Sequence, residues 1–232
     1  MTGIAVGLAN HGCIVSVQRS AGSLVGATDA DRRFIQRGGV PTGIAGASQG
    51  SGNASSFIFS LPSSTRQWEI WNGIQFIGRS AAAHEIDIAI IPHEVGVALR
   101  GLPVGGAPTG RPKVAIECKD VGSAGGPDEM RAFIARLYDL TILDGHWKVA
   151  HLAKPLQAIY PGAPAANDPY QTYWDGNRAT FNSVARRTGF AAGSLGMSGY
   201  YGVQPRGAIF PGSSEDAALV QDLVNWILLE LA

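Results

Sequence analysis

Two short apolar segments of this sequence carry charged side chains at every second position. The first contains Glu85 and Asp87 among isoleucines, and the second ends with Glu117 and Lys119. In a β-strand, residues i and i+2 point to the same face, so each pair is expected to project together. Charged groups inside a sheet are costly unless they pair with one another or bind a metal ion. These two segments therefore constrain both the fold and the chemistry of the chain.

If the two segments are neighbouring strands, three carboxylates and one ammonium group converge at one place. Carboxylate oxygens are the ligands that Mg²⁺ prefers, and a bound Mg²⁺ activates water and neutralises charge on a phosphoryl group. The alternative interpretation is a structural ion pair between Lys119 and either Glu85 or Asp87. A buried pair of this kind adds little net stability, so the pattern favours a functional site.

The order of these residues also resembles the core signature of a known family. Asp87 within a hydrophobic run, followed by a second run that ends Glu117-Cys118-Lys119, is similar to the motif of the PD-(D/E)XK nuclease superfamily. The similarity extends from about Trp68 to the helix expected after Lys119. The resemblance implies an α/β fold with a restriction-endonuclease-like mixed central β-sheet flanked by helices.

The resemblance also implies roles for the motif residues. Asp87 and Glu117 would hold Mg²⁺, or Mn²⁺ in its place, with the backbone carbonyl of Cys118 as a third ligand. Lys119 would position the attacking water or help to deprotonate it. Glu85 shares the face of Asp87 and is expected either to assist at the metal or to be solvated. Many members of the family have a further acid on an upstream helix, and this sequence offers no clear counterpart; the weaker candidates are Asp29, Asp31 and Glu69.

The remaining sequence predicts a single domain over residues 1–232, with N-terminal strands and a C-terminal helical elaboration. Strands are expected within residues 1–20 and 57–59, and a further one over 68–77 with a hairpin turn at Asn72-Gly73. A helix is expected to begin at Pro127, because Met130, Phe133, Ile134 and Leu137 follow helical spacing. Further helices are expected from about 178 to 188 and after Ser213, and a strand over 147–152.

Substrate contacts are predicted in one stretch near the end of the chain. Aromatic side chains stack on bases and arginines pair with phosphates, which favours Trp174, Arg178, Arg186 and Arg187 as nucleic-acid-binding residues. The alternative is that the aromatic residue belongs to the core and the arginines are simply solvated.

Composition limits the classes of protein that fit. Eighteen basic and eighteen acidic residues give a net charge of zero, which disfavours a protein that wraps nucleic acid with a basic surface. Two distant cysteines, no convincing signal peptide and no long apolar run favour a soluble cytoplasmic protein without a membrane partner.

Taken together, the residues and the resemblance predict a Mg²⁺-dependent endonuclease that acts on DNA before RNA, of a restriction, repair or phage-defence type. By analogy with the family, it is expected to form a homodimer or another homo-oligomer. The alternative is a non-catalytic nucleic-acid-binding or assembly module on the same fold, and a weaker one is a hydrolase of small phosphoesters.

Overall fold

A computed structural model describes residues 1–19, 21–26, 33–36, 54–78, 80–103, 108, 110–119, 125–142, 181–186, 192–201, 203–206 and 214–232. These residues form one seven-stranded sheet whose strand order follows the sequence. The first five strands are antiparallel to their neighbours, whereas the last two run parallel to the fifth. The strands are β1 (Ile14–Arg19), β2 (Ser55–Ser60), β3 (Gln67–Ile77), β4 (Ala83–Pro92), β5 (Val114–Lys119), β6 (Phe181–Arg186) and β7 (Val203–Arg206).

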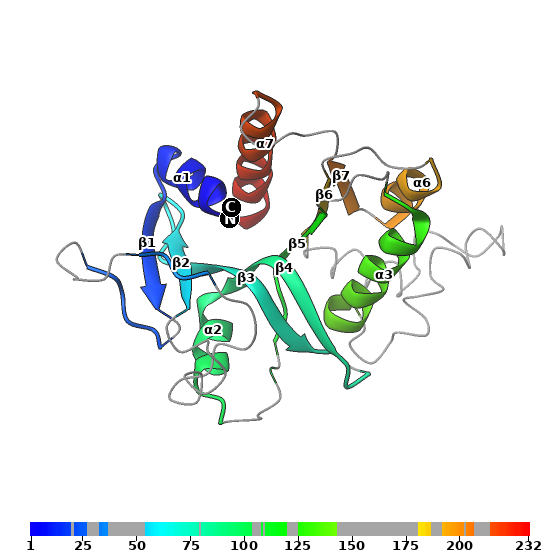
Figure 1. Cartoon of the computed structure of the whole chain (residues 1–232). Coiled ribbons are helices and arrows are strands. Elements are labelled where there is room, and N and C mark those ends of the chain that lie inside the picture. Colours follow the sequence, from blue (N-terminus) through cyan, green and yellow to red (C-terminus); the bar gives the residue numbers. More distant parts are fainter. Residues whose placement is uncertain are drawn as a thin grey trace, which may run out of the picture.

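Helices pack on both faces of the sheet, which confirms the expected mixed sheet flanked by helices (Figure 1). The α1/α7 face is covered by α1 (Thr2–Asn10) and α7 (Ser214–Leu231), which lie side by side. The α3 face is covered by α2 (His93–Arg100) and α3 (Pro127–Leu137), with α6 (Ala192–Tyr201) beside α3. A short π-helical segment, η2 (Tyr138–Ile142), continues α3.

Of the one or two strands expected within residues 1–20, the one at Ile14 is confirmed as β1, whereas the residues before it form a helix. Ile4, Ala5 and Leu8 are buried, and they repeat with helical rather than strand spacing. Gly7 faces α7 so closely that a Cβ atom at this position would lie 2.6 Å from a methyl group of Val224. The glycines that weaken a helical pattern in the sequence therefore allow two helices to approach one another.

The expected hairpin at Asn72-Gly73 is also wrong, because β3 runs through this dipeptide without turning. The ladder with β4 pairs Asn72 with Ile88 and Ile74 with Ile86, so both sides of Gly73 stay paired in one register. Gly73 has φ of 56°, in the left-handed region that glycine adopts without strain. The dipeptide is therefore an irregular point within a long strand.

Both strands change face at this irregular point. Trp71 and Ala89 pack in the core of the α3 face, and so do Ile74 and Ile86. Strict alternation would send Ile74 to the face opposite Trp71, and Ile86 to the face opposite Ala89. The side-chain alternation therefore shifts by one residue in both strands, while the register of their pairing is kept. We call this shift the face change at Gly73.

Of two helices expected in the second half of the chain, one is present and the other is not. The helix at Pro127 is confirmed, and its four predicted apolar residues are all buried. The helix expected from 178 to 188 is wrong, because residues 181–186 form β6 and pair in parallel with β5. The strand expected over 147–152 lies outside the described residues. None of the described helices has the length and apolar character needed to span a bilayer.

Candidate functional site

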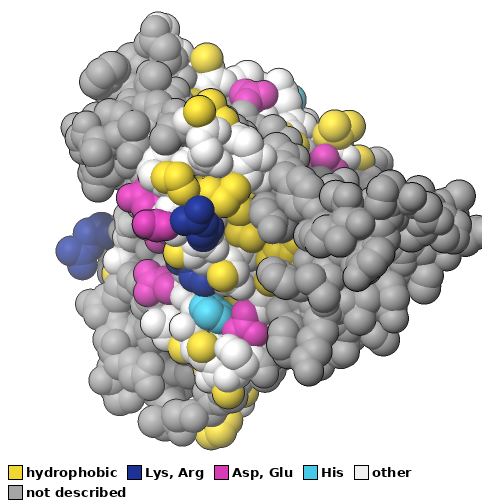
Figure 2. Space-filling view, turned by 90° about the vertical axis from the view of Figure 1, so that its right-hand side faces the viewer, with side chains coloured by type: hydrophobic (Ala, Val, Ile, Leu, Met, Phe, Trp, Pro, Cys, Tyr) yellow, Lys and Arg dark blue, Asp and Glu magenta, His cyan; other side chains and the backbone are white. Residues whose placement is uncertain are grey.

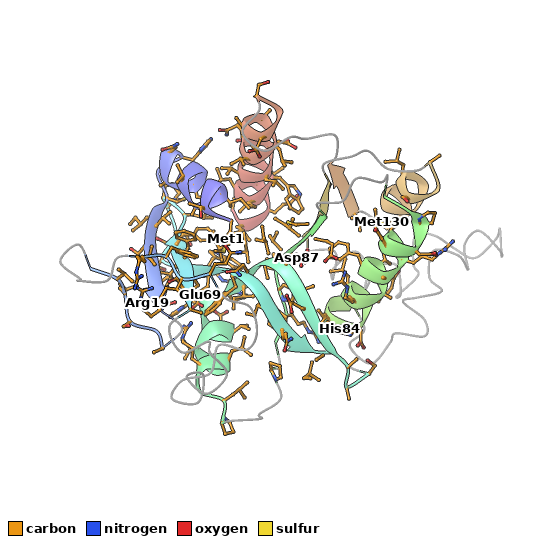
Figure 3. All side chains as sticks on the ribbon, viewed as in Figure 1. Met1, Arg19, Glu69, His84, Asp87 and Met130 are labelled. Carbon is orange, nitrogen blue, oxygen red and sulfur yellow. The ribbon has the colours of Figure 1, made fainter. Side chains whose placement is uncertain are left out.

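A polar pocket of about 360 Å³ lies on the α1/α7 face, beside the first residues of α1. Figure 3 labels Met1 and Asp87, two residues of its lining. Glu85 and Asp87 both line it, as the i, i+2 spacing predicts. They reach this face because the face change at Gly73 turns Ile86, which lies between them, into the core of the α3 face. The other residues of the lining that matter below are Asn72, Gly73 and Cys118.

Asp87 also ties its strand to β5. Its Oδ2 atom accepts a hydrogen bond of 2.7 Å from the backbone N–H of Cys118. The paired residues of β4 and β5 end at Ile88 and Ile116, so this side-chain bond joins the strands just beyond their ladder. It leaves Oδ1 of Asp87 without a hydrogen bond from the residues that the structure describes. One carboxylate oxygen is therefore fixed and the other remains available to a ligand.

Glu117 points to the opposite side of the sheet. It is 2% exposed, and its Oε1 accepts a 2.7 Å hydrogen bond from Nη2 of Arg136 on α3. Nη1 of the same arginine donates to the backbone carbonyl of Glu85. Ala115, two residues before Glu117, packs in the core of the α3 face. The expected meeting of Asp87 and Glu117 is therefore not observed, because the face change moves Asp87 to the other face.

Lys119 is the last residue of β5, where it pairs in register with Arg186 of β6. The side chains of both residues lie outside the described part of the structure. Its predicted role at the attacking water therefore stays a prediction.

Asn72 is a lining residue that the sequence interpretation placed in a turn. It is 9% exposed, and its Oδ1 atom has no hydrogen bond among the described residues. Two carboxylates and this amide oxygen are hard donors of the kind that Mg²⁺ and Mn²⁺ bind. No three His, Cys, Asp or Glu side chains of the described residues are grouped as a metal site. The set that fits a divalent cation therefore includes an amide, which the motif does not contain.

The carboxylate of Glu69, the strand candidate for a further acid, is bound by side chains away from the pocket. It is completely buried and binds both terminal nitrogens of Arg100 on α2, at 2.8 and 2.6 Å. The indole N–H of Trp71 donates to the same carboxylate, and His93 lies 2.6 Å from it. The side chain of His93 is itself partly buried. A Cβ at Gly96 would overlap the carboxylate, so the helix approaches Glu69 through a glycine. This cluster stabilises the packing of α2 on β3.

His84 is held by a hydrogen bond on β4. Its Nε2 lies 2.6 Å from Oδ2 of Asp139, and Ser80 donates to the same carboxylate through its backbone N–H and its hydroxyl. Burial acts to raise the pKa of Asp139, but the hydrogen bonds from Ser80 and His84 outweigh it and hold that pKa below its usual value of 3.8. The charged form of Asp139 is therefore favoured in the folded state.

Asp139→Asn is expected to lower the free energy of unfolding at pH 7 by about 1–3 kcal/mol, since hydrogen bonds to a charged acceptor are lost. A depressed folded pKa stabilises the protein above the unfolded pKa and loses its effect as the pH falls through the folded value. The difference between wild type and variant should therefore shrink below about pH 4 in urea denaturation curves. Asp128→Asn, at a highly exposed position, is the control. A difference that is constant down to pH 2 would contradict this assignment.

The predicted nucleic-acid contacts cannot be located, because Trp174, Arg178 and Arg187 lie outside the described residues, as does the side chain of Arg186. On the side of the molecule that carries α3 and α6, described acidic and basic side chains lie next to one another, together with a histidine (Figure 2). This visible face thus has no large patch of one charge among its described residues.

No family model, curated protein or solved structure matches this chain. The motif, the strand order and the geometry of the pocket are therefore the observations that bear on function.

Proposed function

We propose that this protein is a metal-dependent nuclease that hydrolyses phosphodiester bonds in nucleic acid, with DNA preferred to RNA. The observation that carries the proposal is the pair of carboxylates, Glu85 and Asp87, that line one polar pocket next to the motif strand β5. Paired carboxylates on a polar pocket suit a hard divalent cation, Mg²⁺ or Mn²⁺.

The order of elements supports a restriction-endonuclease-like fold. Among the described elements, three antiparallel strands, β3, β4 and β5, are followed by α3 and then by β6, which runs parallel to β5. This is the order of strand, strand, strand, helix and strand that the resemblance implies. The described structure adds α2 between β4 and β5, and two further strands at the N-terminal edge of the sheet.

Within this proposal, the residues of the chain have distinct tasks. Asp87 binds the cation through Oδ1, while the N–H of Cys118 holds Oδ2 and fixes the plane of the carboxylate. Glu85 supplies a second carboxylate. Lys119 is expected to share the face of Glu117, so its predicted role at the attacking water requires its side chain to reach round the end of β5. A bound divalent cation would supply Lewis acidity and lower the pKa of a water molecule. Glu117 orients Arg136 on the other face and so supports the backbone of Glu85.

A non-catalytic nucleic-acid-binding or assembly module on the same fold is the second candidate. It is favoured by the ion pair of Glu117 with Arg136, which keeps one of the motif acids away from Asp87. The net charge of zero also suits a protein that contacts its partner only locally.

Incubation of purified wild type with nucleic acid separates these candidates. With Mg²⁺ or Mn²⁺ we expect cleavage of DNA, loss of cleavage in EDTA, and recovery when excess Mg²⁺ is added back. Single- and double-stranded DNA and RNA are the four substrates, and a chromogenic phosphodiester is the fifth. A folded protein that is inert on all five contradicts the nuclease, and activity on the fifth alone indicates a hydrolase of small phosphoesters.

If the substrate is duplex DNA, a two-fold symmetric dimer would present one site to each strand. We therefore propose a homodimer as the active form, by analogy with the family.

A further inference from the structure

The side-chain oxygen of Asn72 is buried in a polar pocket without a hydrogen-bonding group of the described residues to satisfy it. Leaving a buried amide oxygen unsatisfied costs about 1–3 kcal/mol, so such groups normally have a partner. The Asn72 side chain sits on a long, well-paired strand, with an apolar residue, Trp71, before it and Ile74 two positions after it. An apolar residue at this position would avoid the cost, so the amide indicates a ligand.

The face change at Gly73 brings the two carboxylates to the side of this amide. Asn72 pairs across the ladder with Ile88, which packs with the core of the α1/α7 face. Asp87 directly precedes Ile88 in β4, and it lies on the same face because the alternation of side chains is shifted there. Gly73 has no side chain to fill the space between Asn72 and Asp87. Asn72, Glu85 and Asp87, from two adjacent strands, therefore line the same pocket.

We propose that Asn72, Glu85 and Asp87 supply three oxygen ligands to one hard divalent cation, in a site on the α1/α7 face that excludes Glu117. One amide and two carboxylates give the charge and donor type that suit Mg²⁺ and Mn²⁺, with water completing the octahedral shell. This site lies in the pocket of the proposed nuclease, and only its role in catalysis rests on that proposal. Binding of the cation itself is a separate property.

Titration of the full-length protein with Mn²⁺, with free Mn²⁺ measured by electron paramagnetic resonance, tests the site without any nucleic acid. Asn72→Ala is expected to weaken Mn²⁺ binding at least about tenfold, the lower end of the loss seen when groups that support a metal site are removed. Asn72→Asp has nearly the same shape and adds a negative charge, so it is expected to bind Mn²⁺ more tightly than wild type. The matched control is Asn225→Ala, on an exposed part of α7.

The outcomes are distinct for the two proposals. Unchanged Mn²⁺ affinity in both Asn72 variants, with loss in Asp87→Asn, overturns the role of Asn72 and leaves the nuclease proposal standing. Absence of Mn²⁺ binding in wild type overturns the site. Binding that depends on Asn72, in a protein that cleaves no nucleic acid, supports the site and contradicts the nuclease. Should Asn72→Ala fail to fold, the Asn72→Asp variant decides, because unchanged affinity there contradicts the proposal.

Discussion

Asp87→Asn is expected to reduce Mg²⁺-dependent cleavage of DNA by about three orders of magnitude. Stabilisation of the transition state by a cation is worth several kcal/mol, and each 1.4 kcal/mol corresponds to about a tenfold change in rate. The amide retains the shape of Asp87 and can still accept the hydrogen bond from the backbone N–H of Cys118. The loss should therefore reflect the missing charge rather than unfolding. Single-turnover cleavage rates measured over a range of Mg²⁺ concentrations provide the test.

Glu94→Gln is the matched control, since Glu94 is an exposed carboxylate at the start of α2 with one long contact to Arg66. Its cleavage rate should equal that of wild type. A second comparison distinguishes the two possible cation sites: Glu117→Gln should lower Mn²⁺ affinity far less than Asp87→Asn, because Glu117 faces Arg136 on the α3 face and an amide oxygen can still accept its hydrogen bond. Wild-type cleavage rates in Asp87→Asn would contradict the proposed role of this residue.

The second large effect concerns stability and not activity. Glu69→Leu is expected to lower the free energy of unfolding by about 3–5 kcal/mol, because it leaves the guanidinium of Arg100 buried without its partner. The indole N–H of Trp71 loses its acceptor at the same time. Urea denaturation followed by circular dichroism measures the change.

A double variant makes this test specific. Adding Arg100→Met to Glu69→Leu removes the unpaired charge, so part of the lost stability should return, as it does when whole buried ion pairs are replaced by apolar residues. Glu94→Gln, on the same helix as Arg100, should change the stability by less than about 0.5 kcal/mol. If the double variant loses as much free energy of unfolding as the two single variants together, the two charges do not interact as their distances imply.

The elements that the sequence predicted well are those whose side-chain period is unbroken. The helix at Pro127 carries its apolar residues at regular helical spacing, and all of them are buried. The strands around Asp87 and Glu117 are equally clear. The N-terminal helix was missed because glycine has a low helix propensity. Here Gly3 and Gly7 instead permit close packing against α7. β6 was mistaken for a helix because its pairing with β5 is a long-range interaction.

The candidate site was predicted only in part, for a related reason. The spacing of Glu85 and Asp87 was sufficient to predict that they share a pocket. It was not sufficient to predict which face they share, because the alternation shifts in both β3 and β4 beside Gly73. Asn72-Gly73 read as a turn, so the buried amide was not considered as a ligand. A one-residue shift in a strand reverses the face of every side chain that follows it, and no local pattern reveals it.

An anomalous difference map from a crystal grown with Mn²⁺ tests the central claim most directly. A peak within about 2.3 Å of oxygen atoms of Asn72, Glu85 and Asp87, with Glu117 still paired to Arg136, is the predicted result. A peak that joins the carboxylates of Asp87 and Glu117 would contradict the account, because it would require both acids to lie on one face of the sheet.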